Sequence, residues 1–208
     1  MKNRLVILSI MSLLIFFSIA NGEDNIWINF VRNPNEFNYE ICQRQVQDSL
    51  SGRYDRFKSP AYLDLMENYL FGKVLSLSRK GNTYARHLCF QFYPLFQGNS
   101  EYLEYLDFTL GTLVREDPEL FLTLVKKYVK EYDNTPYHLD GMLTNYGEEF
   151  VDKIDKQIKE TDERIAALQK VDRKDLEELR NRCIERLTEE KMLLVENKKR
   201  LDLKSQSK

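Results

Sequence analysis

The charged end of the chain decides the fold, and residues 151–168 of it read VDKIDKQIKETDERIAAL. Apolar side chains, with one threonine among them, recur there at alternating intervals of three and four residues. This interval keeps them on one face of a helix that packs against another helix. The pattern continues to residue 201, with a shift of one residue after position 183. We therefore predict a coiled coil with the following seam: Val151, Ile154, Ile158, Ile165, Leu168, Leu176, Leu179, Cys183, Leu187, Leu194 and Leu201.

A polar segment, residues 169–175, interrupts this pattern and leaves two arrangements open. Asp172 or Asp175 has the side chain to cap a new helix, so residues 149–170 would face residues 173–204 in an antiparallel helical hairpin. The alternative is one helix of about 55 residues, roughly 80 Å long. We expect the hairpin, because it covers the narrow apolar stripe within one chain.

The composition of the chain changes near Gly147. Residues 23–146 hold 22 of the 25 aromatic residues, whereas residues 147–208 hold one aromatic residue and 32 charged residues. Aromatic rings bury large areas and can fill a wide core, but a segment that is half charged can bury only a stripe. We predict an aromatic-rich helical domain at 23–146, followed by a charged coiled-coil arm at 147–208.

Capping residues and prolines divide the aromatic-rich domain into helices. Asn82 and Asp117 are placed as N-caps, and Pro60 and Pro118 stand at first helical positions. Helices are predicted at 37–50 and 60–79, from 83 to the proline at 94, from 100, from 118 and at 135–146. An offset of 36 residues aligns several of their apolar positions. The all-α fold is therefore either an irregular helical bundle or a solenoid-like array of helical repeats.

The first 20 residues have the pattern of a secretory signal peptide. Lys2 and Arg4 precede an apolar run, and Ser18 and Ala20 put small residues before the expected cleavage point. The run reaches roughly 24 Å as a helix, short of the ~30 Å hydrocarbon layer. We expect a signal peptide at 1–20 and no membrane span after its removal. A chain rich in Lys, Asn and Ile is typical of bacteria, so the expected destination is the periplasm or the medium.

Three cysteines would then meet an oxidising compartment. Cys42 and Cys89 both lie in the aromatic-rich domain, and a disulfide between them would stabilise the fold by roughly 3–4 kcal/mol on the loop-entropy model. The alternative is two buried free thiols. Cys183 lies in the predicted seam, where it would act as a small apolar side chain.

The residues offer little sign of catalytic, metal or cofactor chemistry. His87 and Cys89 are two residues apart, so on a helix they point to different faces, and no CxxC or HExxH spacing occurs. Glu104 and Asp107 occupy a tyrosine-rich helix, where a carboxyl group could serve as a general acid towards a sugar. The alternative is that they form the exposed face of that helix. We predict no catalytic residue, no metal site and no cofactor.

Interaction with protein is the expected function. The formal net charge of −2 gives no global attraction to nucleic acid. We expect an exported, non-catalytic helical protein that serves as a protein–protein interaction or scaffold module, with the arm contacting a protein partner or a second copy. The alternative is a helical ligand-binding protein or hydrolase with an aromatic-lined groove, because tyrosine and phenylalanine rings stack on sugar and peptide groups.

Overall fold

The computed structural model describes residues 26–51, 71–96, 100–129 and 137–206. Every element in these ranges is helical, which confirms the prediction of an all-α fold. The predicted signal peptide and the first half of the predicted helix at 60–79 lie outside the described residues. No helix within the described ranges is both long enough and apolar enough to cross a membrane.

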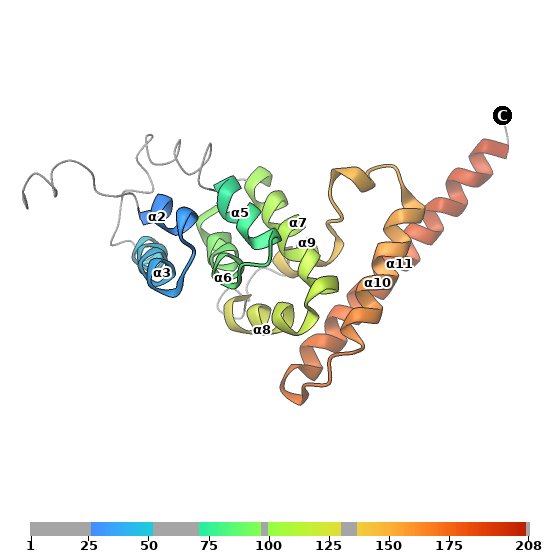
Figure 1. Ribbon diagram of the computed structural model, residues 1–208. Coiled ribbons are helices and arrows are strands. Elements are labelled where there is room, and N and C mark those ends of the chain that lie inside the picture. The colour runs from blue at the N-terminus through green and yellow to red at the C-terminus, as the bar shows by residue number, and fades with distance from the viewer. Residues whose placement is uncertain (1–25, 52–70, 97–99, 130–136, 207–208) are drawn as a thin grey trace, which may run out of the picture.

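Figure 1 shows the helices of the described residues. In chain order they are α2 (Ile26–Arg32), α3 (Glu36–Leu50), α5 (Phe71–Arg79), α6 (Thr83–Phe92), η3 (Tyr93–Phe96), α7 (Ser100–Glu116), α8 (Pro118–Tyr128), α9 (Tyr137–Thr144), η5 (Glu148–Phe150), α10 (Ile154–Leu168), η6 (Lys174–Leu176) and α11 (Glu177–Gln206).

Side-chain caps fix the starts of several helices. The Asn82 side chain accepts a hydrogen bond from the backbone N–H of Ala85 at 2.9 Å, and Asp117 accepts one from Leu120 at 3.2 Å. Each cap satisfies a backbone donor that the first turn of a helix leaves without a partner. Both predicted caps are therefore confirmed, and α8 also begins with the predicted proline.

Aromatic side chains form much of the core of the first region. Trp27, Phe30, Phe90, Phe92 and Phe121 are almost completely buried. The rings of Trp27 and Phe92 lie 5.5 Å apart, and those of Phe90 and Phe121 lie 6.4 Å apart. Burial of one such side chain contributes roughly 1.5–3 kcal/mol, so this core is the main stabilising feature of the region.

In the arm, α10 and α11 lie side by side and run in opposite directions (Figure 1). Lys191 forms an ion pair with Asp162 at 2.6 Å, and Lys198 forms one with Asp155. The later residue of α11 pairs with the earlier residue of α10, as expected for antiparallel helices. The arm therefore contains two separate α-helices, α10 and α11, rather than one continuous helix.

The predicted seam residues differ in their burial. Five of them are buried: Leu168, Leu176, Cys183, Leu187 and Leu194. Four are half-buried: Ile154, Ile158, Ile165 and Leu179. Val151 and Leu201 are 61% and 56% exposed, so their assignment to the seam is wrong. Val151 precedes α10, and Leu201 lies past the level at which α10 begins, so neither belongs to the stretch where α10 and α11 pack against each other.

The arm also packs on the helices that precede it. Leu168, Val171 and Leu176 belong to the same hydrophobic core as Phe121 and Leu124 of α8. Lys126 of α8 forms an ion pair with Asp175 at 3.1 Å. These contacts join the arm to the aromatic-rich region across residue 147. That the two regions fold independently stays a prediction.

The three cysteines are free and buried. The Cys42 thiol donates a long hydrogen bond to the carbonyl oxygen of Ile26 at 3.7 Å, instead of forming the expected bridge to Cys89. Burial raises the pKa of Cys42, Cys89 and Cys183 to about 12. The three thiols therefore stay protonated, and the alternative of buried free cysteines describes the structure.

Candidate functional site

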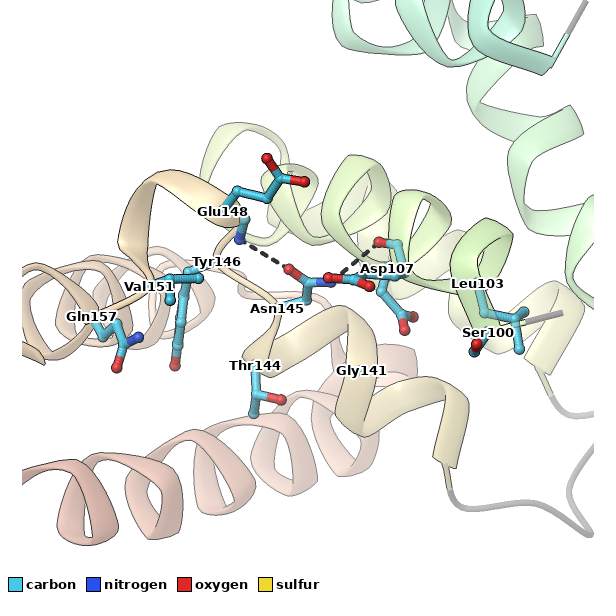
Figure 2. A pocket seen from close by; sticks show the side chains of 12 residues that line it. Ser100, Leu103, Asp107, Gly141, Thr144, Asn145, Tyr146, Glu148, Val151 and Gln157 are labelled. Atoms are coloured by element: carbon cyan, nitrogen blue, oxygen red, sulfur yellow. Dashed lines mark hydrogen bonds between the residues drawn. The ribbon is translucent and has the colours of Figure 1, made fainter. Parts of the chain in front are cut away.

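A polar hollow lies between α7, α9 and the loop that leads into α10 (Figure 2). It has a volume of about 490 Å³, and its walls include Leu103, Glu104 and Asp107 of α7. A neighbouring hollow of about 600 Å³ shares Glu104 and Glu148 with it and adds Glu101, Tyr105 and Arg79. We call the two together the α7 hollow. The combined volume of the two hollows is large enough to hold several side chains of a bound protein or peptide.

Asn145 fastens the loop to α7. Its side-chain amide donates to the carbonyl oxygen of Glu104 at 3.1 Å and accepts from the backbone N–H of Gly147 at 2.9 Å (Figure 2). Gly147 has a φ of 88°, and a Cβ there would come within 2.6 Å of the Phe108 ring. Only glycine fits this left-handed backbone so close to an aromatic ring.

Asp107 forms the buried part of the α7 hollow. The Tyr93 hydroxyl donates to its carboxylate, and the backbone of Gly141 lies so close that a Cβ there would be 2.3 Å from an oxygen of Asp107. Burial raises the pKa of Asp107 to about 7, the hydrogen bond from Tyr93 opposes this shift, and the charge of Glu104 adds to it. Asp107 therefore exchanges its proton near neutral pH.

The rim of the α7 hollow carries acidic side chains without cations. Glu101, Glu104 and Glu148 are exposed, and none of them forms an ion pair with a residue in the described part of the chain. The one basic residue of the wall, Arg79, donates to the Thr109 hydroxyl at 3.0 and 3.1 Å and lies 5.0 Å from the centre of the Phe108 ring. The free polar atoms of the rim are therefore mainly carboxylate oxygens, which bind hydrogen-bond donors and cations.

A buried arginine supports the wall that α9 provides. Arg164 of α10 donates to the carbonyl oxygens of Met142, Leu143 and Asn145 at 3.3, 2.7 and 3.3 Å, and to Glu160 at 3.2 Å. These carbonyls end α9, where a helix leaves acceptors unpaired and favours a cation. We call Arg164 and its partners the Arg164 cluster.

The last turns of α11 form a second exposed feature. Lys198 still contacts Asp155 near the start of α10, and residues beyond it extend past α10 (Figure 1). Leu201 and Leu203 are 56% and 68% exposed. Residues 196–206 contain four basic and two acidic side chains. We call this segment the α11 tip.

The structure places the residues that the sequence singled out as follows. Glu104 and Asp107 come together at the α7 hollow, but His87 and Cys89 form no common site. The Nδ1 atom of His87 lies 3.0 Å from the Tyr128 hydroxyl, and burial lowers the pKa of His87, as does the charge of Lys127. The side chain of His138 lies outside the described residues. Within the described ranges, no group of three or more His, Cys, Asp or Glu side chains is arranged to hold a metal ion.

The sequence prediction missed the residues that shape the α7 hollow. Gly141 and Gly147 let the backbone approach Asp107 and Phe108 closely. Asn145 holds the loop against α7, and Arg164 binds the end of α9. In a chain with only eight glycines, two glycines within seven residues were a usable signal of tight backbone packing. Arg164 had no such signal, because 16 basic residues of the arm look alike in the sequence.

No protein-family model, no curated protein and no solved structure matches this chain.

Proposed function

We propose that this chain is an exported, non-catalytic helical protein that binds a protein partner through the α11 tip. Export is supported by the pattern of residues 1–20, and the binding role by the exposed leucines of the tip. One observation carries the proposal: the apolar stripe by which α11 packs on α10 continues along α11 past the end of α10.

The stripe runs through three leucines at intervals of seven residues. Leu187 is fully buried, Leu194 is 8% exposed and Leu201 is 56% exposed. The change occurs because α10 begins at Ile154, which lies close to the level of Lys198. A partner that covered Leu201 and Leu203 would remove apolar surface from water, which is favourable by about 25 cal/mol per Å².

The charge of the α11 tip indicates the chemistry of the partner. Its four basic side chains outnumber its two acidic ones, and Lys198 already binds an aspartate of α10. A basic helix with exposed leucines favours a surface that combines acidic groups with apolar side chains. We therefore expect the partner surface to be acidic and partly apolar.

A photo-activated cross-linker tests this proposal in the full chain. Placed at position 203 in cells that export the protein, it should give a cross-linked product, while the same group at Asn181, an exposed position nearer the start of α11, should give none. The additional change Leu201→Glu should abolish the product, because it places a charge in the apolar contact. A product that survives Leu201→Glu, or none from position 203, would contradict the proposal.

A further inference from the structure

We propose that the partner of the α11 tip is a second copy of this chain, and that the tip of one copy docks in the α7 hollow of the next. This inference rests on the proposed function, because it names the partner of the same tip. It joins two exposed features of one molecule that have complementary chemistry.

Charge is the first part of this complementarity. Glu101, Glu104, Asp107 and Glu148 face one basic residue, Arg79, in the α7 hollow. Arg79 already donates to Thr109, and no cation in the described part of the chain forms an ion pair with the rim carboxylates. The α11 tip has the opposite excess, with four basic side chains against two acidic ones. Arg200 pairs with Glu196 at 2.6 Å and Lys198 pairs with Asp155 of α10, and the tip keeps a net positive charge. Opposite potentials of this kind steer association and select the partner.

Apolar surface is the second part. Leu103 lies in the wall of the α7 hollow, Val151 at its edge is 61% exposed, and Tyr105 is 42% exposed. These side chains can cover Leu201 and Leu203, which remain exposed on the tip. Aromatic and aliphatic groups surrounded by charges are the usual composition of a small protein interface.

The contact must form between copies and not within one. The ion pairs Lys191–Asp162 and Lys198–Asp155 hold α11 along α10, and the tip continues in the same direction, away from α8 and α9 (Figure 1). A helix does not bend back on itself without a break, so the tip cannot reach its own hollow. A contact of one surface with a different surface on the next copy produces a ring or an open chain of copies.

Sedimentation velocity and light scattering of the purified full chain provide the first measurement. We expect the mean mass to increase with protein concentration, to exceed one chain in the micromolar range, and to decrease at high salt, because salt screens the charges. A chain that stays monomeric at every concentration would overturn this inference. If the chain is monomeric but position 203 still cross-links to a different protein, the proposed function is retained and only the docking between copies is rejected.

Charge exchange gives the sharper test. The double change Lys199→Glu with Arg200→Glu reverses the charge of the α11 tip. The double change Glu101→Lys with Glu104→Lys reverses the charge of the α7 hollow. Each double variant alone should be monomeric, and an equal mixture should assemble again, because every tip then meets a hollow of opposite charge. Circular dichroism checks that both variants fold. Failure of the mixture to assemble would contradict the docking.

A matched control separates docking from general charge effects. Glu178→Lys with Glu185→Lys changes the net charge by the same amount as the hollow variant, on exposed positions of α11 away from its tip. This control should assemble like the unmodified chain. Loss of assembly in the control as well would show that net charge, rather than the α7 hollow, governs association, and would overturn the inference.

Discussion

Two clusters of charged residues, one centred on α10 and the other on α7, use their charges in opposite ways. In the Arg164 cluster, the guanidinium is buried and bonded to three carbonyl oxygens and to Glu160. In the α7 hollow, Glu101, Glu104 and Glu148 are exposed and lack a cation among the described residues. Buried charges persist only when they are paired, so the first cluster maintains the fold. The second is available to an external cation.

Removal of Arg164 should produce the largest loss of stability. Arg164→Met keeps most of the side-chain volume but leaves the three carbonyl oxygens at the end of α9 without donors, and we expect a loss of about 3–5 kcal/mol in the free energy of unfolding. Urea denaturation measures it. The control Arg182→Met, at an exposed position, should change the same quantity by less than about 0.5 kcal/mol. Equal effects of the two changes would remove the distinction between the clusters.

Gly147→Ala should have the second-largest effect. The backbone at Gly147 has a φ of 88°, and the new methyl group would meet the Phe108 ring at 2.6 Å. We expect a loss of about 1–3 kcal/mol. Gly72→Ala is the matched control, because Gly72 is helical and a Cβ there meets nothing within 4 Å. It should stabilise the fold by about 0.5–1 kcal/mol, and thermal denaturation would show the opposite signs.

Asp107→Asn should change the pH dependence of stability. Burial raises the pKa of Asp107 from 3.8 to about 7 in the folded chain. Between these values the folded chain binds more protons than the unfolded chain, so the free energy of unfolding decreases as the pH rises and stays low above about pH 7. Asparagine remains neutral and can still accept the hydrogen bond from Tyr93. Because Asp107 is only partly buried, we expect the variant to be more stable at about pH 8 by about 2 kcal/mol.

Urea denaturation at about pH 5 and about pH 8 measures this difference. The stability of the variant should change less between the two pH values than that of the unmodified chain. If both proteins lose the same stability on going to the higher pH, Asp107 does not titrate in this range, and the buried part of the α7 hollow is charged throughout.

Local patterns in the sequence predicted the helices and their caps, but not the way charges are distributed between the two clusters. Asn82 and Asp117 act within a few residues of their own positions, so the sequence contains the whole interaction. Arg164 instead contacts Leu143, which is 21 residues away, and Asn145 contacts Glu104, which is 41 residues away. The same limit explains the error at Leu201, because its periodicity is intact and only the position at which α10 begins leaves it exposed.

The smallest expected effect comes from the rim of the α7 hollow. Glu101→Gln with Glu104→Gln removes two like charges that lie three residues apart on α7, so the free energy of unfolding should rise by about 0.2–0.5 kcal/mol. The charge of Glu104 also raises the pKa of Asp107, so NMR titration of Asp107 should show a lower pKa in this variant. A clear loss of stability would mean that these carboxylates hold the fold together as the Arg164 cluster does, and the α7 hollow would then have no charges left for a partner.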